Sequence, residues 1–334
     1  MRVGVLGLGS IGSRHARNLV ALGHDVVGYD PRPASGHEPW ARAPSPSEAL
    51  ATVEAAVVAT PTAMHAEHAT LALERGLPVL VEKPITVDPL EADRVVALAA
   101  DHGLTCGVAM NLRFHRGVLA LRDLVSQGRL GEIRFAQVWC GSDLRTWRPG
   151  TDYRTSYSAR ADLGGGIVRD AIHELDYLTW ILGPAASVTA EVAHISDLEI
   201  DVEDIAAALI RLAGGALASV DLTYVDPVYR RGCMLVGAES TARWDWTRGT
   251  VEIARPDAAP EALDVAADVA ETYVDEMRDF IDAARAGRAP RTSAAEGRDA
   301  VRLADALLRS AAEGRRVTLL TAGQGPDAAA DDQE

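Results

Sequence analysis

The feature that most constrains this chain is a glycine turn close to its first residue. The apolar run Val3–Leu6 leads into Gly7-x-Gly9-x-x-Gly12, and a helical segment follows over 11–22. In this pattern the first glycine permits a tight turn, the second lets a pyrophosphate approach the backbone, and the third lets the helix lie close to the strand. The start of the helix also presents free N–H groups to phosphate. We predict a dinucleotide site here, with a turn used only for packing as the alternative. Its predicted phosphate-binding residues are Gly7, Gly9, Ser10, Ile11 and Gly12.

An acidic residue at the end of the second strand bears on the choice of dinucleotide. The strand at 25–29 ends at Asp30, eighteen residues after Gly12. A carboxylate at this spacing can accept both ribose hydroxyls of an adenosine. Its charge would repel a 2′-phosphate, which favours NAD as the cofactor. Arg32 could neutralise such a phosphate, so NADP stays open as the alternative.

Composition limits the classes of function that remain. The chain has 334 residues, of which 48% are hydrophobic, and this size suits two domains with packed cores. A formal charge of -15 with no basic run opposes binding to nucleic acid or to an anionic membrane. No apolar run approaches the ~20 residues of a membrane span, and no signal pattern follows Met1, so we expect a cytoplasmic protein. The three cysteines are far apart and form no Cys-x-x-Cys pair, so we expect buried thiols and no metal site.

Strands and helices alternate through the first third of the chain. Strand-like runs occur at 3–6, 25–29, 55–59, 78–81 and 105–108, with helical patterns between them. This alternation predicts an α/β fold with a doubly wound parallel sheet, in which ligands bind beyond the carboxyl ends of the strands. The further residues that we predict to bind the cofactor there are Thr60, Pro61, His65, Glu82, Lys83, Pro84 and Asn111.

The pattern changes from about Phe114. Strand-like runs at 185–195, 205–212, 216–224, 233–236 and 241–246 are joined by short turns, and they predict a large, mostly antiparallel open sheet. Helices at 269–286 and 294–313 follow. We therefore predict a Rossmann dinucleotide-binding domain at 1–114, an α+β substrate-binding domain at 115–322, and a disordered tail at 323–334.

Lys83 stands at a strand end between an acid and a proline. If the pyrophosphate lies over Gly9, the nicotinamide ring would lie near this lysine, and an ammonium there can polarise a carbonyl or support an alkoxide as hydride leaves. Pro84 is a candidate for a cis peptide bond that aims the lysine. A surface lysine before a turn is the alternative.

A second constellation follows three glycines, Gly164 to Gly166. Asp170, His173 and Asp176 recur at intervals of three residues, which places them along one face of the predicted helix. A single histidine on a helix is usually a core or surface residue. A histidine between two carboxylates, directly after glycines that let the backbone approach a ligand, favours a catalytic acid or base.

These motifs occur together in the order and at the intervals of a known family. From Met1 to about Leu320 the chain resembles the glucose-fructose oxidoreductase, inositol dehydrogenase and rhizopine-catabolism family (Gfo/Idh/MocA). The resemblance implies that Lys83, Asp170 and His173 bind and deprotonate a sugar or cyclitol hydroxyl while NAD or NADP takes the hydride. It also implies a homodimer or homotetramer joined through the open sheet of the second domain.

The histidine spacing departs from part of that family. Inositol dehydrogenases usually place the histidine four residues after the aspartate, whereas His173 follows Asp170 by three. On an ideal helix a spacing of three turns the ring about 60° away from the direction of Asp170, to the opposite side from a spacing of four. The substrate of inositol dehydrogenases therefore cannot be transferred to this chain.

A polar stretch before the glycines carries aromatic and arginine side chains. Such groups suit stacking on a sugar ring and binding of a carboxylate or phosphate, and a solvated loop is the alternative. The predicted substrate-binding residues are Arg113, Trp147, Arg148, Arg154, Tyr157, Asp170, His173 and Asp176.

Three functions remain open on this basis. The first is an NAD(P)-dependent dehydrogenase or reductase that acts on a sugar, sugar acid, cyclitol or nucleotide-linked sugar. The second is a glycoside hydrolase of the same fold that keeps NAD bound and uses a transient oxidation. The third is a sensor that binds the dinucleotide without catalysis. Such a sensor would have no need of acid and base groups, so the presence of Lys83, Asp170 and His173 together argues against it.

Overall fold

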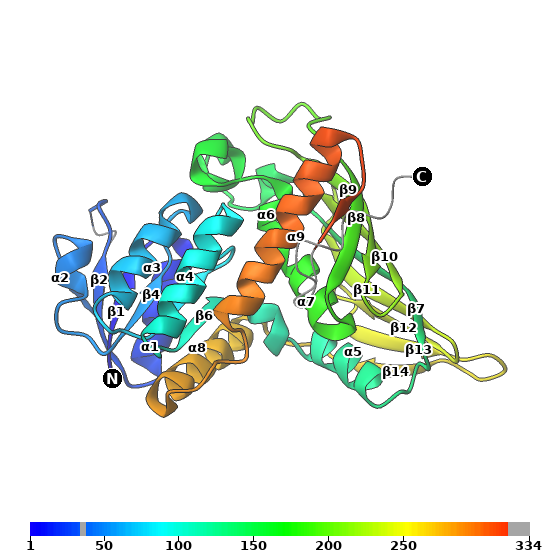
Figure 1. The fold of residues 1–334 in the computed structure, drawn as a ribbon, viewed down its shortest axis with the longest axis horizontal. Coiled ribbons are helices and arrows are strands. Elements are labelled where there is room, and N and C mark those ends of the chain that lie inside the picture. The colour runs from blue at the N-terminus through cyan, green and yellow to red at the C-terminus, as the bar shows by residue number, and fades with distance from the viewer. Residues whose placement is uncertain (34–37, 320–334) are drawn as a thin grey trace. The chain divides into compact units, whose positions relative to one another are not determined.

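The chain forms two compact units in the computed structural model, which describes residues 1–33 and 38–319 (Figure 1). Unit 1 consists of Met1–His115, Arg154–His173 and Ala267–Val301. Unit 2 consists of Arg116–Tyr153, Glu174–Ala266 and the residues from Arg302 onward. The tail predicted at 323–334 lies outside the described residues.

Unit 1 contains the predicted parallel sheet. Its strand order is β3-β2-β1-β4-β5-β6, and every neighbouring pair is parallel. The order reverses direction between β1 and β4, which is where ligands bind in doubly wound sheets. The prediction of a doubly wound α/β sheet is confirmed. The strands are β1 (Arg2–Leu6), β2 (Asp25–Tyr29), β3 (Ala41–Arg42), β4 (Ala55–Val58), β5 (Val79–Glu82) and β6 (Cys106–Ala109).

Two helices of unit 1 begin at capping aspartates. The Asp88 carboxylate accepts the N–H of Leu90 at 2.7 Å, and Pro89 occupies the first helical position of α4. Asp268 caps α8 in the same way, through the N–H of Ala270 at 2.8 Å. The helices that lie wholly in this unit are α1 (Ser10–Ala21), α2 (Pro46–Ala49), α3 (His65–Leu73), α4 (Pro89–Asp101), α6 (Ile167–Asp170) and α8 (Val269–Ala286).

The core of unit 1 joins segments that are far apart in the sequence. Val3, Val5 and Leu19 pack in one buried cluster with Met277 and Phe280 of α8. Figure 1 shows α8, in orange, beside the blue elements from the start of the chain. The parallel sheet therefore obtains part of its apolar cover from residues near the end of the chain.

Unit 2 is built on a nine-stranded sheet of order β14-β13-β12-β11-β7-β10-β9-β8-β15. Its pairs are antiparallel apart from β7 and β10, which run parallel. The prediction of a mostly antiparallel sheet is confirmed. The strands are β7 (Ile133–Gly141), β8 (Ala185–Ala193), β9 (Ile205–Leu212), β10 (Leu217–Thr223), β11 (Arg230–Gly237), β12 (Thr241–Asp245), β13 (Thr250–Ala254), β14 (Glu261–Asp264) and β15 (Val317–Thr318).

One helix packs closely on this sheet because a glycine leaves room for a tryptophan. Helix α5 (Arg116–Ser126) contacts β12 and β13. A Cβ atom at Gly117 would lie 2.1 Å from Nε1 of the buried Trp244, so no larger residue fits there.

The remaining helices are α7 (Ile172–Leu182) and α9 (Ala294–Glu313). The three cysteines are buried free thiols, as expected, and burial raises the pKa of Cys106 to about 12.

The helix predicted after the three glycines is broken. Helix α6 ends at Asp170 and α7 begins at Ile172, because Ala171 between them adopts φ −91° and ψ 27°, outside the helical range. The prediction that Asp170, His173 and Asp176 lie along one face of one continuous helix is therefore wrong. The carbonyl oxygen of Asp170 accepts a hydrogen bond from Lys83 Nζ at the break.

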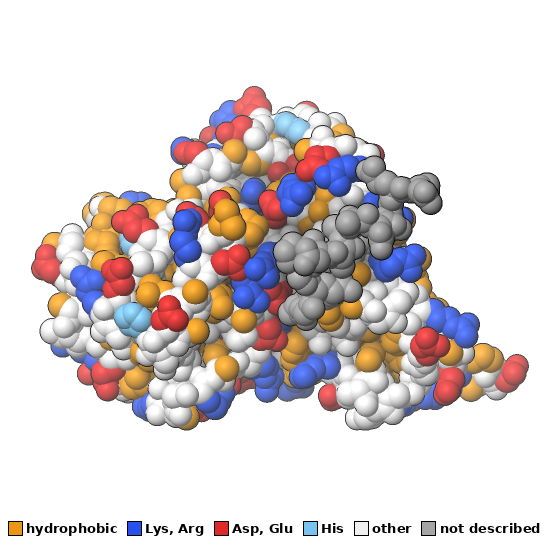
Figure 2. Space-filling view, in the orientation of Figure 1, with side chains coloured by type: hydrophobic (Ala, Val, Ile, Leu, Met, Phe, Trp, Pro, Cys, Tyr) orange, Lys and Arg blue, Asp and Glu red, His pale blue; other side chains and the backbone are white. Residues whose placement is uncertain are grey.

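The surface drawn in Figure 2 carries charges of both signs. On the face drawn in Figure 2, acidic and basic side chains are interspersed. Within the described ranges, 1–33 and 38–319, none of the helices is long and apolar enough to cross a membrane.

Candidate active site

The glycine turn leaves open space at one of its three glycines. A Cβ atom would lie 1.8 Å from the carbonyl oxygen of Gly7 if placed on Gly12, and 2.5 Å from that of Ala59 if placed on Gly7. Both positions therefore require glycine for the fold itself. At Gly9 the nearest atom is Nη2 of Arg32 at 3.5 Å, so packing does not demand a glycine there. A glycine at a position where packing does not require one fits the close approach of a pyrophosphate to the backbone.

The start of α1 also fits a phosphate group. Gly9 is the N-cap of α1, and among the described residues no side chain caps this helix. The first turn, which begins with Ser10 and Ile11, carries no acidic residue. Its N–H groups and the positive end of the helix dipole are therefore available to an anion. The residues present fit the phosphates of NAD.

Asp30 lies at the end of β2 and is held from two sides. Its Oδ2 accepts the N–H of Leu8 at 2.8 Å, and its Oδ1 accepts the N–H of Arg32 at 2.9 Å. The Arg32 guanidinium adds an ion pair at 2.9 Å. Burial raises the pKa of Asp30, but these hydrogen bonds lower it more, to about 2. The carboxylate is thus charged and fixed, and the Arg32 side chain, which donates to both of its oxygens, would have to move for ribose hydroxyls to bind there.

His65 joins the ends of two strands from within the protein. Its Nε2 is 2.8 Å from the carbonyl oxygen of Thr60, after β4, and its Nδ1 is 2.8 Å from that of Pro84, after β5. Burial lowers the pKa of His65, although both carbonyl groups act to raise it. The ring therefore holds two loops that follow the carboxyl ends of the sheet. A direct contact of His65, Thr60 or Pro61 with the cofactor stays a prediction.

Lys83 reaches the break between α6 and α7. Its Nζ donates to the carbonyl oxygen of Asp170 at 2.8 Å and lies 3.8 Å from Oδ1 of the same residue. The lysine side chain keeps 17% of its surface exposed, whereas Asp170 is buried. The Lys83–Pro84 peptide bond is cis, as predicted. An ammonium and a carboxylate from segments 87 residues apart are thus brought together in unit 1.

Lys83 is also the only lysine in the sequence. The chain contains 33 basic residues of the Lys and Arg types, and the other 32 are arginine. A surface cation can be either type, but an ammonium is a compact point charge with three donors, which a planar guanidinium cannot replace. Position 83 is therefore the one place in this sequence where a lysine was used in preference to arginine.

His173 and its neighbours lie just after the break. His173, Asp170 and Asp176 are all buried. Asp170 and His173 belong to unit 1 and Asp176 to unit 2, so their joint action on a substrate stays a prediction. The fully buried Glu174 follows His173, and its Oε1 pairs with Nε of Arg231 at 2.8 Å. Sequence reasoning missed Arg231, because no local pattern links β11 to this helix.

His15 is a second residue that sequence reasoning missed. It lies in α1, and its Nε2 is 2.6 Å from Oε1 of Glu82. Glu82 also accepts the N–H of Lys83, at 3.0 Å, through Oε2. An indication in the sequence was that His15 follows Gly12 by about one helical turn. The two residues therefore share a face of α1, and this face is turned toward the sheet.

Two of the three glycines before α6 serve the protein's own packing. A Cβ atom at Gly164 would lie 2.5 Å from Cγ2 of Val87, and one at Gly165 would lie 2.3 Å from the carbonyl oxygen of Tyr157. The backbone here approaches other parts of unit 1. Close approach to a ligand is not needed to explain these two glycines.

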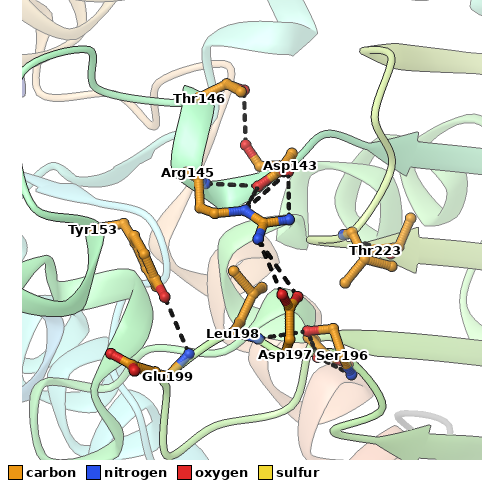
Figure 3. A network of polar contacts seen from close by, with 11 residues as sticks. Asp143, Arg145, Thr146, Tyr153, Ser196, Asp197, Leu198, Glu199 and Thr223 are labelled. Atoms are coloured by element: carbon orange, nitrogen blue, oxygen red, sulfur yellow. Dashed lines mark hydrogen bonds and ion pairs between the residues drawn. The ribbon is translucent and has the colours of Figure 1, made fainter.

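The loop that carries Trp147 and Arg148 is tied to a second loop in unit 2 (Figure 3). Arg145 binds Asp143 at 2.9 Å and reaches Asp197 at 3.4 Å. The Tyr153 hydroxyl accepts the N–H of Glu199 at 3.1 Å. Between these ties, the Trp147 ring packs its edge against Tyr224, with centroids 5.2 Å apart. The network holds the loop at both of its ends.

The other predicted contacts have partners inside the protein. Asn111 donates to the Thr272 hydroxyl at 2.8 Å, and the buried Arg113 pairs with Glu296 at 2.5 Å. Both tie the end of the first segment of unit 1 to its last segment. Arg154 and Tyr157 belong to unit 1, while Trp147 and Arg148 belong to unit 2. Binding of substrate by these residues stays a prediction.

Two family models match the chain. Residues 1–110 match a model described as an oxidoreductase family with an NAD-binding Rossmann fold. Residues 118–243 match a model described as a GFO/IDH/MocA C-terminal domain. The first match confirms that residues 1–110 form an NAD-binding Rossmann domain, and together the two matches confirm the resemblance drawn from the motifs.

Named relatives cover nearly the whole chain. Inositol 2-dehydrogenase 2 of Paenarthrobacter aurescens is 31% identical, over 93% of this chain and 96% of the relative. UDP-N-acetylglucosamine 3-dehydrogenase of Acidithiobacillus ferrooxidans is 27% identical, over 86% of this chain and 90% of its own. A levoglucosan dehydrogenase solved in complex with NADH superposes with a TM-score of 0.85 at 21% identity, over 96% of this chain and 99% of that one. At that identity the solved structure supports the fold.

Proposed function

Because the chain belongs to the Gfo/Idh/MocA family of NAD-binding oxidoreductases, we propose that it transfers a hydride between NAD and a hydroxyl-bearing carbon. The proposed substrate is a sugar, sugar acid, cyclitol or nucleotide-linked sugar, a range that the names of the relatives support. The observation that carries the proposal is the contact of the only lysine, Lys83, with Asp170 at the end of α6.

Lys83 and His173 have separate roles in this proposal. The Lys83 ammonium has three donors and spends one on the Asp170 carbonyl, so the others can bind the substrate hydroxyl and stabilise negative charge on its oxygen. The imidazole of His173 takes the hydroxyl proton. With NAD as the hydride acceptor, loss of that proton and of the carbon-bound hydride converts the alcohol to a carbonyl. Asp170 fixes the ammonium through its carbonyl group and, at 3.8 Å, its carboxylate.

The remaining predictions complete the proposal. Residues 1–114 bind the cofactor, with Glu82, Pro84 and Asn111 near the nicotinamide, and 115–322 bind substrate and join subunits. Specificity comes from aromatic and arginine side chains, which stack on a ring or bind an anionic group. The proposed specificity residues are Arg113, Trp147, Arg148, Arg154, Tyr157 and Asp176. We propose the cytoplasm as the compartment.

The experiment is a panel of free sugars, sugar acids, cyclitols and nucleotide-linked sugars, each mixed with NAD. Formation of reduced nicotinamide is followed by its absorbance. Net reduction of added NAD supports a dehydrogenase. Cleavage of a glycoside without net reduction would assign the protein to the hydrolases of this fold instead, and binding of NAD without either reaction would make it a sensor.

The Lys83→Met variant tests the site with the best substrate from that panel. Turnover should fall by a factor on the order of 10² or more with NAD binding largely intact, because the charge is lost while the length of the side chain is kept. Lys83→Arg is the matched control, because it keeps the positive charge but replaces the compact ammonium with a planar guanidinium. If the variant bound NAD much more weakly but turned over normally once NAD was bound, the role of Lys83 would be structural.

Self-association through the nine-stranded sheet is the last part of the proposal. Leu209 of β9 and Leu217 of β10 are apolar and exposed, the first with 57% of its surface, and they lie two register positions apart on adjacent strands. Analytical ultracentrifugation should show a dimer or tetramer. Leu209→Asp should shift it toward the monomer, whereas Leu90→Asp, at an exposed leucine of unit 1, should not.

A further inference from the structure

A buried histidine and glutamate form a pair behind the glycine turn. His15 of α1 has none of its surface exposed, and Nε2 of its ring is 2.6 Å from Oε1 of Glu82, the last residue of β5. Glu82 is buried as well. Such a pair costs desolvation that an apolar contact of the same size would avoid, so packing alone gives no reason for it.

The hydrogen bond within the pair has a defined direction. Burial raises the pKa of Glu82, but the hydrogen bond and charge of His15 and the charge of Lys83 lower it to below its ordinary value. A carboxylate that is ionised can only accept, so Nε2 of His15 is the donor. The other ionisable groups around the pair include Tyr273 of α8, whose ring edge faces His15, Arg14 above that ring, and His65 near Glu82.

The second oxygen of Glu82 connects the pair to Lys83. Oε2 accepts the N–H of Lys83 at 3.0 Å, and Lys83 Nζ donates to the Asp170 carbonyl at 2.8 Å. A continuous series of hydrogen bonds thus runs from the helix that follows the glycine turn, through the end of β5, to the end of α6. Every group in it belongs to unit 1.

We propose that His15 is a positioning residue for Lys83. The imidazole holds one oxygen of Glu82, so the other oxygen stays directed at the backbone of Lys83 and fixes the point from which the ammonium reaches Asp170. In this arrangement His15 contacts neither substrate nor cofactor. The inference rests on the role proposed for Lys83, and it assigns the buried pair to catalysis through another residue.

Removing the donor should disturb Lys83 first. Without His15, Glu82 would be a buried carboxylate that has lost one partner, and such a group takes up a proton or turns to another donor. Either change withdraws the acceptor of the Lys83 N–H. His15→Leu removes the donor and puts an apolar side chain of similar size in its place, whereas His15→Gln keeps an N–H donor. Glu82→Gln removes the charge from the other side.

The single lysine allows a test that does not depend on a reaction. Biosynthetic incorporation of lysine labelled with ¹³C at Cε places the label at Lys83 alone, since the sequence has no other lysine. We expect the NMR signal of Lys83 in His15→Leu and Glu82→Gln to move toward that of a free lysine, and the signal in His15→Gln to stay near that of the parent. As pH falls, the signal in His15→Leu should change at a higher pH than in the parent, because His15 no longer lowers the pKa of Glu82.

Turnover gives the second measurement. On a substrate from the panel, His15→Leu should lose activity on the order of 10- to 100-fold, the worth of one hydrogen bond to a charged group, while His15→Gln recovers most of it. Calorimetric affinity for NAD should change little in either variant. This separates a positioning residue from one that binds the cofactor.

The outcomes separate this inference from the proposed function. An unmoved Lys83 signal in His15→Leu would overturn the positioning role, whatever the turnover. A signal that moves in a protein whose parent oxidises nothing in the panel supports the positioning role and counts against the proposed function alone. If His15→Leu does not fold, Glu82→Gln decides, and an unmoved signal there overturns the inference.

Discussion

Each of the two residues proposed for the chemistry has a buried glutamate next to it in the sequence, and the two glutamates are held differently. Glu82 precedes Lys83 and pairs with His15 in unit 1. Glu174 follows His173 and pairs with Arg231 in unit 2. The partner is a titratable imidazole in the first pair and a guanidinium in the second.

The difference concerns how each pair responds to pH. An arginine keeps its charge throughout the working range of proteins, so the Arg231 pair is a fixed anchor for the first turn of α7. The pair behind Lys83 can respond to pH through Glu82, because His15 and Lys83 lower the pKa of that carboxyl group from its ordinary value. The comparison teaches that two proposed catalytic groups with similar neighbours in sequence can have supports of different kinds.

The largest effect is expected at His173, on the side with the fixed anchor. His173→Ala should lower oxidation turnover on the order of 10² to 10⁴, with NAD affinity nearly unchanged. Oxidation in the parent should accelerate with pH as the imidazole becomes neutral, and reduction should slow over the same range. Turnover against pH in both directions measures this. A variant that kept the parent's turnover and profile would move the proton acceptor away from His173.

A large loss of stability is expected when the fixed pair is broken. Arg231→Met should lower the free energy of unfolding by about 3–5 kcal/mol, because the buried Glu174 then loses the guanidinium with which it pairs. The double variant Glu174→Leu/Arg231→Met should recover most of this loss. Urea denaturation of the three proteins measures it. A double variant as unstable as the single one would show that Arg231 stabilises unit 2 through other contacts.

A smaller, pH-dependent effect is expected at the titratable pair. The fold lowers the pKa of Glu82 from its ordinary value of 4.5, so ionised Glu82 adds stability above that value and loses it as pH falls through the lower folded value. The difference in the free energy of unfolding between the parent and Glu82→Gln should therefore be constant above about pH 5 and become smaller below it. Denaturation at a series of pH values tests this. A difference that grows with acidity would mean that Glu82 is not held as a carboxylate.

The smallest effect is expected at Asp30, whose partner Arg32 has a side chain 69% exposed. We expect the parent to bind NAD more tightly than NADP. Asp30→Ala should narrow that gap by about fivefold, the worth of a like-charge contact of about 1 kcal/mol at 4 Å in water. Arg32→Ala should widen it, since a cation beside the 2′ position is lost. Calorimetric titration with both cofactors decides, and a parent that prefers NADP would refute the assignment of Asp30.

Local signals predicted most of the fold. Helices α8 and α9 agree with the expected 269–286 and 294–313, because a long apolar periodicity marks both and a capping aspartate precedes α8. Strands β13, β14 and β15 were missed. They are short and alternate buried or half-buried residues with exposed ones, and β14 carries charged residues at both ends, so an isolated window gives little strand signal.

Non-local contacts determine what the sequence could not predict. The position of Asp170 depends on the break at Ala171, and its carbonyl group binds a lysine 87 residues earlier in the chain. Arg231 lies 57 residues after Glu174. His15 was overlooked because a histidine on an amphipathic helix has no distinctive pattern of its own. Residue types could be chosen from motifs, whereas their partners depend on tertiary packing.

The position of α8 has a consequence for the order of synthesis. Met277, Phe280 and Ile281 complete the core around β1 and α1, yet the ribosome makes them about 170 residues after the first segment of unit 1 ends. At about 5–20 residues per second, roughly 8 to 33 s pass before they appear. The nascent parallel sheet therefore waits with part of its apolar surface uncovered. Chaperone binding during translation should concentrate on that interval and end once α8 has emerged.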